Sequence, residues 1–270
     1  MNNKINPKLY KRVVGYGCSY TAGDEIADHL ILNISFEECK KLKKKFSNQT
    51  QFYNHYNIVH QHEMLWSNSW AAQLANLINL PYLNRATPGS SIGHIYFDIY
   101  KDYVNKLISK DDLILVGITE PSRIMYWDEE SSKLDSCPLS HYLQKLDKQS
   151  GMAVSDLCSD NILIFSYFCH LQNISNLKNI LDIRLQYMCP EPILDIKRPG
   201  GPLKITKVVD NILIHMYKDI DNILLKNDNL QDSYLEIVGH CGYGHPPLES
   251  HTNLAQKIYK ECVIEYTINT

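Results

Sequence analysis

Ser19 follows a short apolar segment and is surrounded by small residues in the stretch VVGYGCSYTAG (13–23). An apolar segment that ends in glycines predicts a buried strand followed by a tight turn. A serine at such a turn can hold a phosphate, attack an ester as a nucleophile, or cap the helix that follows. The residues around Ser19 decide among these uses.

Three familiar glycine turns are each excluded by one position. The dinucleotide-binding pattern G-x-G-x-x-G has Tyr20 in place of its third glycine. The phosphate-binding P-loop needs a Lys-Ser/Thr pair after its last glycine, and none follows Gly23. The nucleophile elbow G-x-S-x-G has Thr21 in place of its final glycine. A structural role, in which Ser19 caps a helix, stays open.

A fourth pattern, distributed along the chain, fits this serine. GCSYTAG (17–23) resembles block I of the SGNH/GDSL hydrolases, with Gly-Cys-Ser in place of the usual Gly-Asp-Ser. NRATPGSS (84–91) is similar to their block II, N-x-A-x-x-G-x-S. The register of block III, Gly-x-Asn-Asp, begins at Gly117, so that Thr119 takes the place of the asparagine. The chain therefore resembles this family at the ends of three expected strands.

The last block adds the base that a serine nucleophile needs. His245 and Pro246 match block V, Asp-x-x-His-Pro, although Gly242 stands in the place of the aspartate. Thr119 and Arg123 match a Thr-x-x-x-Arg ending of the third strand. That ending accompanies GCSxTAG in one variety of the family, which is often encoded by phages and in surface-polysaccharide loci.

The resemblance implies a chemical role for each matched residue. Ser19 would attack an ester carbonyl while His245 takes its proton. The N–H groups of Ser19 and Gly89, with the hydroxyl of Thr119 as a third donor, would bind the oxyanion. The implied activity is the removal of small O-acyl groups such as acetyl, from a small ester or a glycan, without cofactor or metal. The implied substrate contacts are Arg123 and Ser90.

The glycine at position 242 leaves the histidine without its usual partner. The carboxylate normally fixes the imidazole tautomer, so Nδ1–H of His245 needs another acceptor. The sequence offers a main-chain carbonyl of residues 242–244, or a carboxylate such as Asp232 or Glu249. Two alternatives follow: a catalytically inactive SGNH-fold protein with a binding or structural role, as in a phage particle, and an acyltransferase that uses the same serine.

Other side chains with chemical potential have an expected structural role. Cys18 ends a buried strand and is expected to face the core rather than act as a thiol nucleophile. His251 is expected to cap the last helix. Arg123 is expected either to face the substrate or to form a buried ion pair. Two groups match no recognised zinc spacing and are expected in polar loops: His55, His60, His62 and Glu63, and His240, Cys241, His245 and His251.

Strands and helices alternate in the first half of the chain. Apolar segments predict strands at 11–18, 80–86 and 111–119, and the third, apolar nearly throughout, is expected to be buried on both faces. Helical spacing of apolar residues predicts helices at 67–79, capped by Ser67 or Ser69, and at 94–108. This order predicts an α/β fold, a three-layer α/β/α arrangement with a flavodoxin-like parallel sheet.

The second half predicts fewer clear elements. No Gly/Ser- or Pro-rich linker divides the chain, so we expect a single SGNH-like domain over 1–270. It would carry a polar insertion at about 24–66 and a variable segment at about 128–160. The expected helices and strands lie at 160–180, 180–188, 206–225, 233–239 and 252–266.

Charge and composition exclude several partners. Lys and Arg number 27 and Asp and Glu 30, so the net charge of -3 gives no basic excess for a nucleic acid or an anionic membrane. The lysine-rich run at 40–46 is expected to be a solvated helix face or loop. No apolar leader or membrane-length apolar run occurs, which predicts cytoplasmic synthesis with reduced cysteines. Association with a virion or release by lysis is compatible with that expectation, and the oligomeric state is left open.

Overall fold

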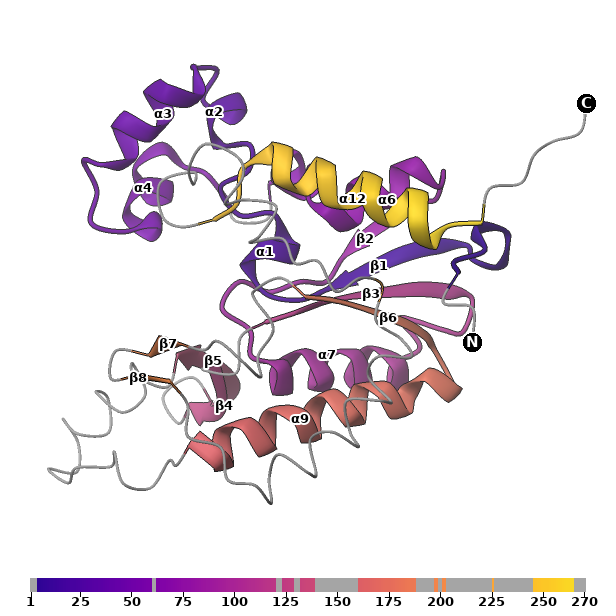
Figure 1. Cartoon of the computed structure of the whole chain (residues 1–270). Helices are drawn as coiled ribbons and strands as arrows, with labels where there is room; N and C mark the ends of the chain where they lie inside the picture. Colours follow the sequence, from indigo (N-terminus) through magenta and orange to yellow (C-terminus); the bar gives the residue numbers. More distant parts are fainter. Residues whose placement is uncertain are drawn as a thin grey trace, which may run out of the picture.

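A four-stranded parallel sheet forms the centre of the computed structural model (Figure 1). The strands are β1 (Arg12–Tyr16), β2 (Tyr82–Asn84), β3 (Asp112–Ile118) and β6 (Asp182–Tyr187), in the order β2-β1-β3-β6. This order is that of flavodoxin-like sheets, so the predicted fold class is confirmed. The structure describes residues 4–59, 62–119, 123–128, 132–138, 160–187, 197–198, 201–202, 225 and 245–264.

Helices cover both faces of the sheet and complete the three layers. Figure 1 shows α6 (Trp70–Leu77) and α12 (Leu248–Cys262) on one face. The other face carries α7 (Ile92–Val104) and α9 (Asp160–Asn176). The predicted strands and helices of the first half are confirmed, with α6 capped by Ser69, whose Oγ accepts from Ala72 N–H. Within the described residues, no helix has the length and apolarity to cross a membrane.

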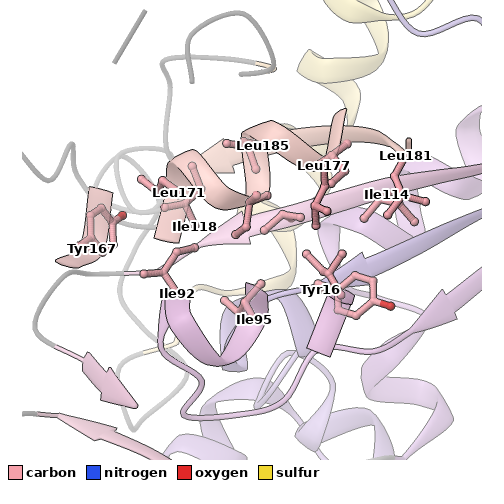
Figure 2. Close-up of a cluster of buried hydrophobic side chains, with 14 of the residues drawn as sticks. Tyr16, Ile92, Ile95, Ile114, Ile118, Tyr167, Leu171, Leu177, Leu181 and Leu185 are labelled. Atoms are coloured by element: carbon pink, nitrogen blue, oxygen red, sulfur yellow. The ribbon is translucent and has the colours of Figure 1, made fainter. Parts of the chain in front are cut away.

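Two apolar clusters fix these layers. Every residue of β3 is buried, as expected for a central parallel strand. On the α7 and α9 side, Ile114 and Ile118 of β3 meet Ile95 of α7 and Leu171 of α9 (Figure 2). On the opposite side, the members come from β1, β3, α6 and α12: Val13, Leu113, Leu115, Trp70, Leu74, Leu254 and Ile258.

The polar insertion at 24–66 is helical and has an apolar cluster of its own. It contains α2 (Asp28–Ile31), α3 (Phe36–Lys43), α4 (Gln49–Tyr56) and α5 (Glu63–Trp66). Helix α3 begins with a capping box, in which Ser35 Oγ accepts from Glu38 N–H and the Glu38 carboxylate accepts from Ser35 N–H. The buried apolar residues of the whole insertion include Phe52, Tyr53 and Leu65.

Short elements and turns join these layers. Helix α1 (Ser19–Ala22) follows β1, and an antiparallel hairpin is formed by β4 (Arg123–Asp128) and β5 (Lys133–Pro138). Sequence analysis does not predict this hairpin. Residues 206–224 and 233–239 of the predicted elements lie outside the described residues, as do 139–159 of the variable segment. The remaining short elements are η1 (Pro7–Leu9), η3 (Leu177–Asn179), β7 (Lys197–Arg198) and β8 (Gly201–Pro202).

His251 joins α12 to α6, and the prediction that it caps the last helix is wrong. The N-cap residue of α12 is Pro247, and His251 lies within the helix, fully buried. Its Nδ1 accepts the N–H of Trp70, the first residue of α6, at 3.1 Å. Burial, together with a smaller effect of the nearby His245, lowers the pKa of His251 to about 3.

We expect His251→Asn to weaken the loss of the free energy of unfolding that accompanies a fall in pH. Asn Oδ1 can replace Nδ1 as acceptor for Trp70 but does not titrate. In the native protein His251 stays neutral down to about pH 3. Its unfolded form takes up a proton below about pH 6.5, so stability falls by up to about 1.4 kcal/mol per pH unit as the pH drops between these values. Urea unfolding from pH 7 to 4 measures this slope; equal slopes for both proteins would contradict the assignment.

Candidate active site

Three of the predicted site residues follow three adjacent strands at one edge of the sheet. Ser19 comes after β1, Gly89 after β2 and Thr119 directly after β3. Because the strands are parallel, with Gly15 paired to Asn84 and Tyr16 to Val116, their carboxyl ends meet at this edge. Open α/β sheets bind ligands at this edge.

Ser19 is the first residue of α1. Its N-cap residue is Cys18, which is buried as predicted, so Ser19 does not cap the helix. Gly17 lets the backbone before Ser19 lie close to the side chain of Thr21, since a Cβ at position 17 would lie 2.3 Å from Thr21 Oγ1. Ser19 is 7% exposed, and no described group accepts a hydrogen bond from its backbone N–H. That N–H belongs to the first turn, where donors have no partner within the helix.

Gly89 lies in a β-turn that is attached to the Ser19 loop. Ser90 N–H donates to the carbonyl of Thr87 at 3.1 Å, and Pro88 and Gly89 occupy the centre of the turn. Gly89 has φ 85°, which matches the third position of a type II turn and favours glycine. Thr87 N–H donates to the carbonyl of Gly17 at 3.0 Å, which connects this turn to the Ser19 loop.

The other residues at this edge are placed as follows. Thr119 is buried, and its carbonyl accepts a hydrogen bond from Tyr167 Oη at 2.8 Å. Ser90 is also buried, and its Oγ has no hydrogen-bond partner among the described residues. Arg123 Nη1 donates to the carbonyl of Gly89 at 3.1 Å.

Glu25 supplies the carboxylate that the sequence lacks at position 242. Its Oε2 lies 2.5 Å from His245 Nδ1 and also accepts the backbone N–H of His245 at 3.3 Å. The acceptors expected from the sequence are thereby corrected: Glu249 is exposed at the start of α12, and Asp232 lies outside the described residues. Sequence analysis missed Glu25 because it precedes His245 by 220 positions. The available sequence signal was the position of Glu25, an acidic residue two places after Gly23, the last residue of block I.

The imidazole of His245 lies beside the nucleophile helix. Its ring meets that of Tyr20 edge to face, with centroids 5.3 Å apart. Tyr20 follows Ser19 directly, so serine, histidine and glutamate belong to one region of the molecule. Among the described residues the structure has no hydrogen bond from Ser19 Oγ to the imidazole. Catalytic hydrogen bonds of unliganded enzymes often shorten only when the substrate is bound.

A buried ion cluster holds Glu25 from the other side. Lys43 Nζ lies 2.6 Å from Glu25 Oε1 and 2.8 Å from Asp28 Oδ2. Tyr53 Oη donates to Asp28 Oδ1 at 2.8 Å and accepts the N–H of Glu25 at 2.9 Å. Lys43 is 2% exposed, so for this residue the expected solvated position of the lysine-rich run is wrong.

Burial and charge act in opposite directions on these carboxyl groups. Burial alone raises the pKa of Glu25, but the hydrogen bond with His245 and the positive charge of Lys43 outweigh it and lower the pKa to about 2. For Asp28, burial raises the pKa more than Lys43 and Tyr53 lower it. Glu25 therefore stays ionised and can accept the Nδ1 proton of His245 across the neutral pH range.

A cavity of about 660 Å³ opens beside α1 and the Gly89 turn. Arg85 donates from Nε and Nη2 to the two oxygens of Asp102, both at 2.7 Å, which fixes its guanidinium. Asp98 projects from α7, and burial raises the pKa of its carboxyl. The lining residues that matter here are Ala22, Trp66, Arg85, Thr87 and Asp98.

The first histidine-rich group was expected in a polar loop, and its described members instead belong to helices: His55 lies in α4, His62 is the N-cap of α5 and Glu63 its first residue. His62 Nδ1 accepts the N–H of Met64 and so begins α5. His55 packs its ring against Phe46 and Tyr56. His60, His240 and Cys241 lie outside the described residues. Within the described ranges, no three His, Cys, Asp or Glu side chains are grouped to hold a metal ion.

Comparisons with known proteins match the chain to solved structures alone. No protein-family model matches the chain, and no curated protein matches it. A solved structure from Parabacteroides merdae, described as a GDSL-like lipase, aligns with 94% of this chain and 96% of its own. Their sequence identity is 10% and the TM-score 0.44, so the likeness carries no argument about activity.

We expect Lys43→Met to destabilise the fold strongly. The change leaves Glu25 and Asp28 buried without their shared cation, and breaking a buried ion pair from one side costs about 3–5 kcal/mol. Lys44→Met is the matched control, because Lys44 is exposed in the same lysine-rich run. Urea unfolding at pH 7 measures both. A loss for Lys43→Met as small as that of the control would show that the ion cluster contributes nothing to stability.

Proposed function

We propose that the protein is a serine esterase in which Ser19, His245 and Glu25 act as nucleophile, general base and orienting carboxylate. The observation that carries this proposal is the 2.5 Å contact between His245 Nδ1 and Glu25 Oε2. A carboxylate at Nδ1 holds the imidazole with Nε2 unprotonated, the tautomer that can accept the proton of a serine hydroxyl. The resemblance of the Ser19, Gly89 and His245 segments to the SGNH/GDSL hydrolases supports the same roles.

The reaction proceeds in two balanced steps. Ser19 Oγ forms a bond to the acyl carbon while its proton passes to His245 Nε2, and His245 returns that proton to the departing alcohol oxygen. Water then attacks the acyl-serine, with His245 again taking a proton and giving it to Ser19 Oγ. The products are the alcohol and the carboxylic acid. Glu25 stays ionised throughout and stabilises the imidazolium in each step.

The oxyanion of each tetrahedral intermediate is bound by main-chain donors. The N–H groups of Ser19 and Gly89 make no hydrogen bond with other described residues, so both are open to an acyl oxygen. Thr119 offers a hydroxyl at the end of the neighbouring strand. The low exposure of Ser19, 7%, favours a small acyl group such as acetyl.

We expect Ser19→Ala and His245→Ala to abolish hydrolysis of 4-nitrophenyl acetate. Glu25→Gln removes the charge beside Nδ1 and should lower kcat roughly 10²–10⁴-fold. A fluorophosphonate probe should label the native protein at Ser19 and leave Ser19→Ala unlabelled. Steady-state kinetics and mass spectrometry of the labelled peptide provide these measurements.

Glu37→Gln is the matched control for the carboxylate, because Glu37 is an exposed glutamate of the same insertion. It should keep native kinetics. Full activity of Ser19→Ala would contradict the proposal. Absence of both labelling and hydrolysis in the native protein would favour the alternative, a catalytically silent binding or structural role.

For the alcohol half of the ester we propose a polyhydroxylated ring, as in a glycan. The cavity beside α1 presents the ring of Trp66, the cationic Arg85 and the carboxylate of Asp98. A sugar ring can stack on an indole, accept hydrogen bonds from a guanidinium and donate hydroxyls to a carboxylate. Because Asp102 already balances the charge of Arg85, the charge left on the described lining is the carboxylate of Asp98, which disfavours an anionic ligand.

We expect Trp66→Ala to raise KM for a mono-O-acetylated hexose about 3- to 10-fold through loss of ring stacking. KM for 4-nitrophenyl acetate should stay within about twofold, because this ester is too small to fill the cavity. Trp66→Phe retains a ring and serves as the control. An equal rise of KM for both esters would mean that Trp66 supports the fold and not the alcohol.

A further inference from the structure

One hairpin supplies two hydrogen bonds to a single carbonyl of the Gly89 turn. Arg123, at the start of β4, donates from Nη1 to the Gly89 oxygen at 3.1 Å. Ser136, on β5, donates from Oγ to the same oxygen at 3.0 Å. The two strands are adjacent, with Arg123 paired to Pro138 and Ser136 to Met125. Both donors therefore belong to one local structure.

The hydroxyl of Ser136 has a partner for its one donor site and for both of its acceptor sites. It accepts the N–H of Ser91 at 3.2 Å and lies 3.3 Å from His94 Nδ1. A hydroxyl has one proton and two acceptor sites. Since the Gly89 carbonyl can only accept, the single proton of Ser136 is directed to it, and Ser136 Oγ accepts from the Ser91 amide and from His94, which then carries its proton on Nδ1. This network joins the hairpin to the first turn of α7, where Ser91 is the N-cap.

The other end of the turn is attached to the nucleophile loop. Thr87 N–H donates to the Gly17 carbonyl, two residues before Ser19. The turn is therefore held by Gly17 on one side and by the hairpin on the other, with the Gly89 N–H between them. Among the described residues, a Cβ on Gly89 would meet nothing closer than Arg123 Nη1 at 3.9 Å, so on this side the turn contacts the hairpin without being tightly packed against it.

We propose that the β4–β5 hairpin aims the oxyanion donor. Arg123 and Ser136 hold the Gly89–Ser90 peptide by its carbonyl, and the Thr87–Gly17 hydrogen bond holds the start of the turn, so that the peptide between them, which carries the Gly89 N–H, is oriented relative to Ser19. This inference rests on the esterase function proposed above. Arg123 and Ser136 are positioning residues, because they act on the acyl oxygen only through Gly89. The proposal gives the arginine of the Thr-x-x-x-Arg pattern a role besides the substrate contact or ion pair expected from the sequence.

The expected signature is a loss of kcat at constant KM. An oxyanion donor bonds most strongly when charge develops on the acyl oxygen, so its misorientation affects the transition state and not ground-state binding. Removal of a whole donor costs roughly 10²–10³ in kcat. For a donor that is misdirected but present, we expect a decrease of about 10- to 100-fold in Ser136→Ala and in Arg123→Met.

The experiment compares five variants in hydrolysis of 4-nitrophenyl acetate, with thermal unfolding recorded for each. Ser136→Thr keeps the hydroxyl and should recover most of the native kcat. In the double variant, Ser136→Ala with Arg123→Met, the fold-decrease in kcat should be smaller than the product of the two single decreases, because both side chains act on one carbonyl. Lys133→Met is the control, because Lys133 is an exposed cation of the same hairpin. It should match the native protein.

The outcomes separate this inference from the proposed function. Native protein without esterase activity overturns both. An active native protein whose kcat changes less than twofold in Ser136→Ala and Arg123→Met overturns the positioning role alone. A fall in activity that follows thermal stability and that Ser136→Thr does not restore also overturns it, because it assigns the hairpin a purely structural part. A kcat loss at native KM, restored by threonine, supports the proposal.

Discussion

The buried contact between Glu25 and Lys43 is the constraint on which the candidate site depends. Two charges at 2% exposure or less are stable only when each has a partner, so the helix that carries Lys43 must dock where Glu25 is held. Glu25 itself has φ 64°, a left-handed conformation that costs a non-glycine residue about 1–3 kcal/mol and persists only where the surroundings impose it. The same carboxylate then fixes the imidazole of His245. The packing of the insertion and the orientation of the His245 imidazole therefore depend on the same carboxylate.

The division of labour in the fold follows from this arrangement. The sheet and its covering helices place Ser19, Gly89 and Thr119 at the carboxyl ends of adjacent strands, which any flavodoxin-like sheet would do. The groups that would activate the serine in the proposed mechanism come from the added parts. The insertion brings the carboxylate, and the β4–β5 hairpin contacts the Gly89 turn. The sheet thus positions the site residues, and the insertion and the hairpin contribute their hydrogen-bond partners.

Local sequence was sufficient to predict the sheet, and insufficient to predict the partners of its site residues. Apolar runs such as that of β3, and capping residues such as Ser69, act within a few positions and so can be read directly. Glu25 and His245 meet across 220 positions, and nothing in the spacing of either marks the other. Lys43 is one of several lysines in its run, and only tertiary packing makes it the buried one. His251 was misplaced for the same reason, since its partner is the amide of Trp70.

The position of His245 near the end of the described chain sets when the site can first exist. Ser19 and Glu25 lie within the first strand–turn–helix region, whereas the imidazole arrives only with the segment that leads into α12. That helix is held on α6 through His251 and Trp70, and Ile5 pairs with Val263 at its far end. In the proposed mechanism, Ser19 therefore gains its base only after residue 245 has been synthesised. Assembly of the last helix acts as the step that completes the site.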